Sequence, residues 1–582
     1  MDIKTVWGET IDPRNVLPEY PRPQMARASY LNLNGLWQYA ITNDDEKPAK
    51  WEGDIVVPFS PESALSGVGR ALQPAQTLWY ERAVTLPAGF CRGRILLHFG
   101  AVDQQARVYV NGVQVCAHTG GYLPFCADIT AQLPALGNAE ESPETTFTLT
   151  VQVKDVTDAS FHARGKQKRK KGGIWYTPQS GIWQTVWMES VPAQYIQALR
   201  ITPCFDESAV EITVCANAPL PCTARVGDIV AQLRANDPTR ISLLGFTPWS
   251  PEHPHLYELK VQMGEDCVQS YFAMRKFAVQ ADEAGVKRLY LNNKPYFHNG
   301  VLDQGYWPDG LYTAPSDEAM VYDIQCMKRL GFNTLRKHIK IEPLRWYYHC
   351  DQIGMLVWQD AVNGGGKYDF LTVTAPVFTG GGVKDDDYKR FGRTDAAGRS
   401  EYTRELTEMI ELLYNCPCIA MWVPFNEGWG QFDAAKALEL VESLDHTRTV
   451  DHASGWHDQG VGEVKSLHVY FKPYAFSPDP LGRAVLLSEF GGYKYLMPEH
   501  APQTRSFGYK ACKTKAELTA AYAKLYETEI LPAKEKGLAA AIYTQLSDVE
   551  GECNGLLTYD RKQVKPEAET VRDINARLAE QE

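Results

Sequence analysis

Two glutamates end apolar, strand-like segments and are the residues best placed to do chemistry. Residues 421–427 are mostly apolar up to Asn426 and Glu427, and residues 485–492 are mostly apolar up to Glu489, which precedes a phenylalanine and a glycine pair. A carboxylate at the end of a buried strand is costly unless it is paired or used. Two such carboxylates facing each other would supply a proton donor and a nucleophile.

This pair of side chains is suited to retaining glycoside hydrolysis. One carboxylic acid protonates the leaving oxygen and the other carboxylate attacks the anomeric carbon, with the two carboxyls about 5 to 5.5 Å apart. Asn426 fits as a donor to the sugar 2-hydroxyl. The alternative is that both glutamates cap strands or pair with Arg336 and Lys337. Because the glutamates occur as a pair at two strand ends, we favour the chemical role.

The elements that position the glutamates follow a β/α pattern from about residue 285 onward. Strands are predicted at 296–302, 333–338, 355–360, 419–427, 449–454, 466–470, 484–490 and 539–545, and helices at 316–330, 343–353, 400–415, 431–444, 515–535 and 566–580. Eight strands are the number that a closed barrel needs. The active site of such a barrel lies at the carboxyl ends of its strands, where both glutamates fall.

The residues before the barrel read as short strands separated by turns. One hairpin carries Asn111-Gly112, which suits a type I′ turn. This pattern of short strands and turns predicts a β-sandwich over residues 1–190. Residues 191–280 continue in strands and have the length of an immunoglobulin-like β-sandwich. The fold class is therefore multidomain, with the barrel occupying residues 281–582.

Composition excludes several classes of protein. The 582 residues are 44% hydrophobic and 22% charged, values typical of folded domains. The net charge of -12 argues against nucleic acid or an acidic membrane as a partner. No apolar run of about 18 residues occurs. The 13 cysteines have no framework spacing, which favours reduced thiols and the cytoplasm. The histidines lack metal-ligand spacing, so neither a metal nor a cofactor is expected.

The chain resembles glycoside hydrolase family 2, the family of β-galactosidases, β-glucuronidases and β-mannosidases. The matching segments are Arg22-Pro23, 33–37, 108–112, 120–122, 180–187, Asn426-Glu427 and Glu489. The resemblance implies a jelly-roll, sugar-binding-like domain (1–190), an immunoglobulin-like β-sandwich (191–280) and a catalytic (β/α)8 TIM barrel (281–582). It also implies that Glu427 is the acid/base, that Glu489 is the nucleophile, and that Tyr470 contacts the nucleophile.

Departures from the family pattern concern the sugar. Arg336-Lys337-His338 is one residue shorter than the usual Arg-x-Ser-His, so His338 is expected to be free to face the other way. The third strand ends in Gln359-Asp360 rather than Asp-Glu, and residues 551–557 lack the lysine with which glucuronidases hold a carboxylate. The candidate substrate ligands are Asn426, His338, Asp360, Tyr470, Trp429, Gln545 and Asp303.

Two loops leave alternatives open. The basic run 164–171 has the pattern of a solvated surface loop, which is the commoner fate of a charge run, and the alternative is contact with an acidic sugar or a sulfate. The glycine-rich loop 361–397 is expected to be either a lid over the barrel mouth or a disordered surface segment.

The sequence thus predicts an exo-acting retaining β-glycosidase of the β-galactosidase type, with an oligosaccharide or glycoside as substrate. One alternative is a β-glycosidase for acidic or pentopyranose sugars, of the β-glucuronidase, galacturonidase or arabinopyranosidase type. The other is a catalytically silent carbohydrate-binding protein, against which the intact Asn426, Glu427 and Glu489 argue. Linkage, aglycone and homo-oligomerisation stay open.

Overall fold

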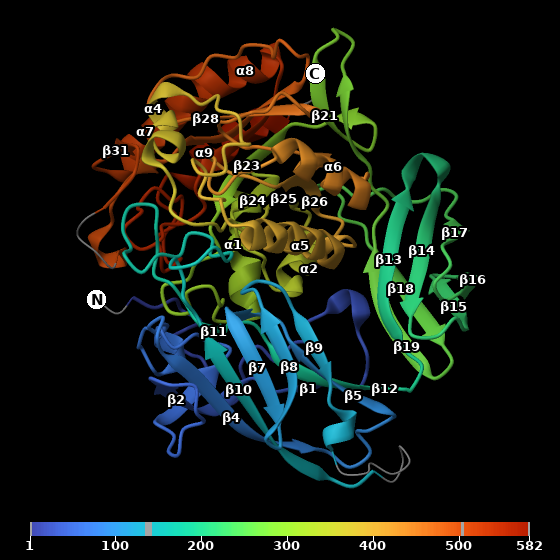
Figure 1. The fold of residues 1–582 in the computed structure, drawn as a ribbon. Coiled ribbons are helices and arrows are strands. Elements are labelled where there is room, and N and C mark those ends of the chain that lie inside the picture. Colours follow the sequence, from blue (N-terminus) through green and yellow to red (C-terminus); the bar gives the residue numbers. More distant parts are fainter. Residues whose placement is uncertain (1–2, 134–141, 502–505, 580–582) are drawn as a thin grey trace.

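The structure, a computed structural model, describes residues 3–133, 142–501 and 506–579. Two antiparallel β-sandwiches precede a parallel β/α barrel, which confirms the predicted fold class. In Figure 1 the first sandwich, in blue, lies below the barrel, and the second, in green, lies beside it. Residues 1–2 and 580–582 of the outer predicted domains lie outside the described residues. Within the described ranges, no helix is long and apolar enough to cross a membrane.

The first sandwich packs a six-stranded sheet, β3-β2-β4-β10-β7-β8, against a four-stranded sheet, β1-β12-β5-β9. Trp37, Ile55 and Leu97 lie in the core between the sheets. Asn111 and Gly112, both with positive φ, form the predicted turn between β7 and β8. The strands are β1 Leu31–Asn32, β2 Gly35–Thr42, β3 Gly53–Val57, β4 Thr77–Leu86, β5 Arg94–Phe99, β6 Val102–Asp103, β7 Gln105–Val110, β8 Val113–Thr119, β9 Phe125–Asp128, β10 Thr145–Lys154, β11 Gly181–Ile182 and β12 Val186–Val191.

The second sandwich has three strands in one sheet, β13-β14-β17, and four in the other, β16-β15-β18-β19. Alternate residues of β14 and β18 point into its core, as expected for sheets with one face exposed. A small sheet, β20-β21-β22, then leads into the barrel. The bounds are β13 Ile196–Cys204, β14 Ala209–Ala216, β15 Pro221–Val226, β16 Ile229–Arg234, β17 Thr239–Ser242, β18 Tyr257–Met263, β19 Asp266–Phe272, β20 Phe277–Ala281, β21 Lys287–Leu291 and β22 Lys294–Pro295.

The barrel contains the eight predicted strands in the order β27-β26-β25-β24-β23-β32-β29-β28. Neighbouring strands are parallel, and β27 and β28 stand at the two ends of this order, so the sheet is nearly closed. Most of its strands are buried along their whole length, which explains their near-continuous apolar sequences. The bounds are β23 His298–Asp303, β24 Thr334–Lys337, β25 Leu356–Asp360, β26 Ile419–Val423, β27 Thr449–Val450, β28 Val464–Val469, β29 Ala484–Gly491 and β32 Leu538–Thr544; β30 Tyr493–Lys494 and β31 Lys510–Ala511 form a separate pair.

Helices surround the barrel, and their ends follow local capping signals. Ser316, Asp395 and Thr514 each accept a hydrogen bond from a backbone N–H of the helix that follows. The helices are α1 Asp317–Arg329, α2 Leu344–Ile353, α3 Phe370–Val373, α4 Pro376–Thr379, α5 Ala396–Leu413, α6 Ala434–Leu444, α7 Lys515–Leu525, α8 Leu531–Lys536 and α9 Ala568–Ala579. Residues 451–483, all of which the structure describes, contain no helix between β27, β28 and β29.

The predicted single helix over 515–535 is wrong in one respect. A π-helical turn, Tyr526–Ile530, separates α7 from α8. Pro532 lies just after this turn. It has no backbone N–H, and its ring would clash with the carbonyl four residues earlier, so a regular α-helix cannot run through it.

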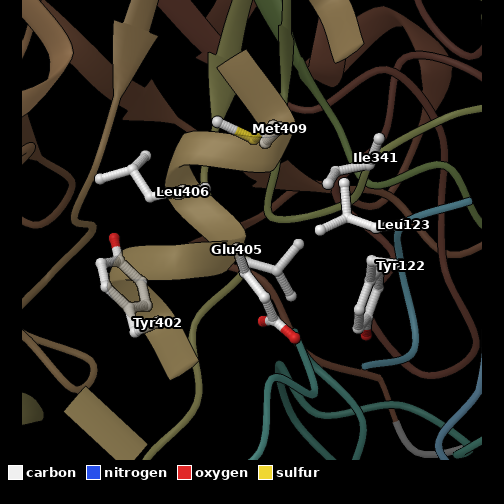
Figure 2. A pocket seen from close by; sticks show the side chains of 9 residues that line it. Tyr122, Leu123, Ile341, Tyr402, Glu405, Leu406 and Met409 are labelled. Atoms are coloured by element: carbon white, nitrogen blue, oxygen red, sulfur yellow. The ribbon is translucent and has the colours of Figure 1, made fainter. Parts of the chain in front are cut away.

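Two cavities lie between the domains and away from the glutamates. One, of about 360 Å³, lies between the first sandwich and the barrel, and two of the side chains that line it, Arg22 and Glu189, form an ion pair at 2.8 Å. The other, of about 10 Å³, lies between α5 and the segment at Tyr122 (Figure 2). The second holds at most about one water molecule and is too small for a sugar.

Candidate active site

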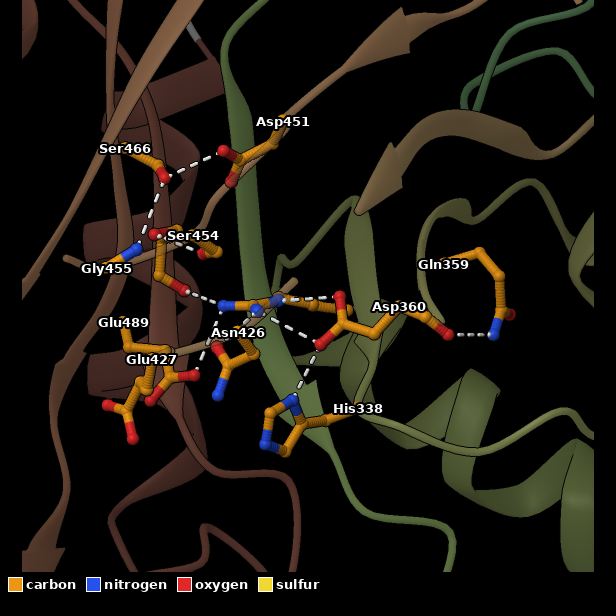
Figure 3. A network of polar contacts seen from close by, with 12 residues as sticks. His338, Gln359, Asp360, Asn426, Glu427, Asp451, Ser454, Gly455, Ser466 and Glu489 are labelled. Carbon is orange, nitrogen blue, oxygen red and sulfur yellow. Dashed lines mark hydrogen bonds and ion pairs between the residues drawn. The ribbon is translucent and has the colours of Figure 1, made fainter. Parts of the chain in front are cut away.

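The two glutamates meet at the carboxyl end of the barrel. Glu427 follows β26, and Glu489 lies near the end of β29 (Figure 3). One carboxylate oxygen of each, together with a ring nitrogen of His468, lies within 4.8 Å of the other two atoms. This separation is close to the carboxyl spacing of about 5 to 5.5 Å for direct attack on a sugar and shorter than the 6.5 to about 9.5 Å needed to place a water between them.

The carboxylate of Glu489 is surrounded by a hydrogen-bond donor and a cation. The Tyr470 hydroxyl donates a hydrogen bond to Oε2, and the Arg336 guanidinium lies 3.2 Å from Oε1. Tyr470 is held by stacking on Tyr509, with ring centroids 3.6 Å apart. Burial raises the pKa of Glu489, whereas the charge of Arg336 and the Tyr470 hydroxyl oppose that rise. The carboxylate is therefore buried but has the donors that an anion needs.

The surroundings of Glu427 favour its protonated form. Burial raises its pKa to about 7, against the opposing charges of Lys166 and Arg336. The backbone of Glu427 has a φ of 51° and is fixed by hydrogen bonds from its N–H to the Ser454 carbonyl and from Trp456 to its own carbonyl. A carboxyl with a pKa near neutrality can give a proton and take it back.

His468 bridges the two glutamates and was not predicted as a site residue. Its Nδ1 lies 2.8 Å from Glu427 Oε1 and 3.6 Å from Glu489 Oε2. Burial lowers the pKa of His468 to about 4, so the ring is neutral near neutral pH. His468 precedes Tyr470 by two residues, and side chains two apart share one face of a strand. That alternation was the signal available in the sequence.

A buried polar network supports the glutamates from the second and third strands. Arg336, which has no exposed surface, donates from Nε and Nη2 to the two oxygens of Asp360, both at 3.0 Å, and from Nη2 to Asn426 Oδ1 at 2.8 Å. His338 Nδ1 lies 2.7 Å from Asp360 Oδ2. Asn426 Nδ2 is buried and finds no acceptor among the described residues. This NH₂ group is therefore available to a ligand.

The expected substrate ligands fall into two groups. Asn426, His338, Asp360 and Tyr470 join the network around the glutamates, and Trp429 packs on His338 with ring centroids 5.9 Å apart. The shortened motif thus leaves His338 on the side of the site, contrary to the expectation that it could turn away.

The two other candidates have different partners. Asp303 forms an ion pair with Lys337 at 2.6 Å. Gln545 is hydrogen-bonded to Gln304 at 2.7 Å and to Asn554 at 2.9 Å. The structure does not join either residue to the glutamates through a described contact.

The loop 361–397 packs over the segments that follow β26 and β27. His457 Nε2 lies 2.7 Å from the Thr372 carbonyl, and Gln431 donates to Asp385 at 3.0 Å. The loop contains the short helices α3 and α4. It covers the chain next to Glu427. That the loop acts as a lid over the barrel mouth stays a prediction.

Comparisons with known proteins agree with this architecture. Residues 69–148 match the sugar binding domain of glycosyl hydrolases family 2, and residues 283–487 match the TIM barrel domain of the same family. A β-galactosidase of Thermoanaerobacter pseudethanolicus is 23% identical over 64% of this chain and 47% of its own length. Human β-glucuronidase is 22% identical over 74% of this chain and 68% of its own length. The chain spans about half the length of the first curated relatives that it matches.

Solved structures share the whole arrangement of domains. A β-D-glucuronidase of Dictyoglomus thermophilum aligns with a TM-score of 0.74 and 16% identity, covering 96% of this chain and 98% of that one. A family 2 β-galacturonidase of Eisenbergiella tayi, with galacturonate bound, aligns with a TM-score of 0.70 and 18% identity, covering 96% and 99%. At these identities the likeness concerns the fold.

Proposed function

Because the chain belongs to glycoside hydrolase family 2, we propose that it hydrolyses a terminal β-linked sugar with retention of anomeric configuration. The observation that carries the proposal is the pair of buried carboxyls, Glu427 and Glu489, with oxygens within 4.8 Å at the barrel mouth. The proposed enzyme is exo-acting and hydrolyses glycosides or short oligosaccharides. The free thiols of all thirteen cysteines support a reducing compartment, the cytoplasm.

The first step uses both glutamates at once. Glu427 gives its proton to the glycosidic oxygen while the Glu489 carboxylate attacks the anomeric carbon, so the glycosidic bond breaks and an ester to Glu489 forms. The aglycone leaves as a neutral alcohol. Asn426, whose NH₂ group has no described acceptor, would hold the sugar 2-hydroxyl.

The second step reverses the proton transfer. Esterification removes the negative charge of Glu489, which repels ionised Glu427, so the pKa of Glu427 falls at the moment when a base is required. Glu427 then takes a proton from water, the water oxygen attacks the anomeric carbon, and Glu489 leaves as a carboxylate. The hydroxyl of Tyr470 and the cation of Arg336 stabilise that carboxylate.

A panel of nitrophenyl β-glycosides tests the activity, and proton NMR of the first anomer formed tests the stereochemistry. We expect a β-anomer first, from at least one glycoside in the panel. An α-anomer would refute retention, and complete inactivity would support the silent carbohydrate-binding alternative. Glu427, His468 and Glu489 are also close enough to hold a metal ion. The proposal assigns them to the sugar, so activity should survive treatment with a chelator.

The identity of the sugar that the enzyme hydrolyses is a separate question. The sequence favours a β-galactosidase type, the activity named for the Thermoanaerobacter relative. The second candidate is a glycosidase for acidic sugars. A buried cation at the barrel mouth favours this second candidate and is considered in the next subsection.

The pH dependence of hydrolysis should follow the ionisation of the Glu427 carboxyl. Its carboxyl must be protonated for the first step with poor leaving groups, and burial raises its pKa to about 7. We therefore expect kcat/KM for an alkyl glycoside to fall above about pH 7 by about one log unit per pH unit. Rate measurements from pH 5 to about 9 check this. The fall should be missing in Glu427→Gln, and a fall that persisted in that variant would assign it to another group.

A further inference from the structure

Lys166 is a buried cation that forms no ion pair with a described carboxylate. The described part of the chain contains four buried lysines, and three of them form ion pairs: Lys337 with Asp303 at 2.6 Å, Lys340 with Glu342 at 2.8 Å, and Lys565 with Asp548 at 2.6 Å. Lys166 is only 5% exposed, and no carboxylate among the described residues pairs with it. Burying an ammonium group without a counter-charge is costly, so an unpaired one calls for a functional explanation.

The contacts of Lys166 place its ammonium group near the residues that follow Glu427. It lies 5.8 Å from the ring centroid of Trp429, two residues after Glu427, and 5.4 Å from that of Tyr176. The charge of Lys166 lowers the pKa of both Glu427 and His338. For each of these two residues it is the largest influence on the pKa after burial. A loop of the first sandwich therefore brings a positive charge to the barrel mouth.

The loop that carries Lys166 is held in place on both sides. Arg164 donates to the carbonyls of Gly365 and Gly366 in the glycine-rich loop, and Gln167 Nε2 donates to Asp103 at 3.0 Å and to Tyr122 at 2.9 Å. The Tyr176 N–H donates to the Lys166 carbonyl at 3.0 Å. Lys166 is thus positioned before any ligand binds, which lowers the entropic cost of binding.

The basic run divides into two parts. Arg164 and Lys166 are buried, whereas residues 169–171 are exposed and fit the solvated-loop explanation. Lys168 lies between these parts, with its ammonium 3.7 Å from the ring centroid of Trp175, and Trp175 packs on Trp429. The buried end of the run therefore presents a cation beside an aromatic wall formed by Trp175 and Trp429.

We propose that Lys166 binds an anionic group of the substrate, a carboxylate or a sulfate ester on the sugar that occupies the barrel mouth. This rests on the proposed glycosidase function and names its substrate class. An oxyanion would give the ammonium group its missing partner through charge-assisted hydrogen bonds, and lysine serves such groups as a point charge. A neutral sugar would leave the buried charge unpaired.

The test compares matched substrates with the full-length chain. The probes are nitrophenyl β-glucuronide, nitrophenyl β-galacturonide and a sulfated nitrophenyl β-galactoside, each against its neutral counterpart. We expect kcat/KM for at least one anionic probe to exceed that for its neutral counterpart by about 10- to 100-fold. The uronides and the sulfated probe separate a carboxylate from a sulfate. A wild-type preference for the neutral sugars would overturn the proposal whether or not any variant folds.

Lys166→Met removes the charge and keeps an unbranched stem on Trp429. We expect the anionic-to-neutral ratio of kcat/KM to fall by about 10- to 100-fold, mainly through KM, and Lys166→Arg to retain part of it. Lys170→Met removes the same charge from an exposed position of the same loop and should leave the ratio within about twofold. An unchanged ratio in Lys166→Met would assign the lysine a structural role only.

A binding measurement separates failure of this inference from failure of the proposed function. Free glucuronate and galacturonate are titrated against tryptophan fluorescence, with glucose and galactose as controls. Uronate binding that is lost in Lys166→Met would support the anion site even if no glycoside were hydrolysed, which would refute only the glycosidase. Hydrolysis of neutral glycosides together with no uronate or sulfated-sugar binding would refute only the anion site.

Discussion

Replacing Glu489 by alanine should abolish hydrolysis, with kcat reduced by roughly a thousandfold or more. The carboxylate is the group that forms the bond to the anomeric carbon in the proposed mechanism, and no other described carboxylate besides Glu427 belongs to the cluster around it. Azide should restore part of the rate with an activated aryl glycoside, because the small anion fits the vacated space and attacks the same carbon. The azide product should have the α configuration.

The matched control for this variant is Glu463→Ala. Glu463 lies just before β28, the strand next to β29, and is exposed. Its removal should change kcat by less than about twofold. If Glu489→Ala kept substantial activity without azide, or if azide gave a β-glycosyl azide, another residue would be the nucleophile.

Replacing Glu427 by alanine should produce losses that depend on the leaving group. An alkyl glycoside needs a proton in the first step, and its kcat/KM should fall by about 10²- to 10⁴-fold. The leaving group of a dinitrophenyl glycoside departs as a stable phenolate anion and needs no proton. The kcat/KM for this substrate should therefore change little. Its kcat should still fall, because the second step loses its base, and azide should accelerate that step and give a β-glycosyl azide.

Glu552→Gln is the control for charge near the site. The negative charge of Glu552 contributes to the raised pKa of Glu427, and its carboxylate accepts hydrogen bonds from Tyr176 and Asn554. At a pH below the pKa of Glu427, where this carboxyl is protonated in both chains, the loss of the Glu552 charge should affect alkyl and dinitrophenyl glycosides alike. Equal losses with both leaving groups in Glu427→Ala would contradict the acid/base assignment.

The barrel could be predicted from sequence because its signals are local. Every strand of β23 to β29 and β32 overlaps a predicted strand, since buried parallel strands read as apolar runs. The ends were less predictable. The predicted strands 419–427 and 449–454 stop at Val423 and Val450. The residues beyond form a looser contact, an isolated bridge between Asn426 and Ser454, that positions Glu427.

The site was predicted only where strand ends mark it. Asn426, Glu427, Tyr470 and Glu489 follow from the pattern of their own segments and from the family resemblance. The environment of Lys166 does not, because its partners Tyr176 and Trp429 come from different domains and no spacing in the sequence brings them together. The same limit applies to Asp303 and Gln545, whose partners depend on packing between neighbouring strands.

The φ of 51° at Glu427 has a consequence for how variants of this chain can be selected. A residue with a side chain is less stable in the left-handed region by about 1 to 2 kcal/mol, whereas glycine and asparagine adopt it readily. The backbone at position 427 is therefore strained because the proposed chemistry needs a glutamate there. The carboxyl of this glutamate is also buried. Glycine or asparagine at position 427 would relieve the strain and remove the proton donor together. A library screened for thermal resistance alone would therefore enrich inactive chains at this position.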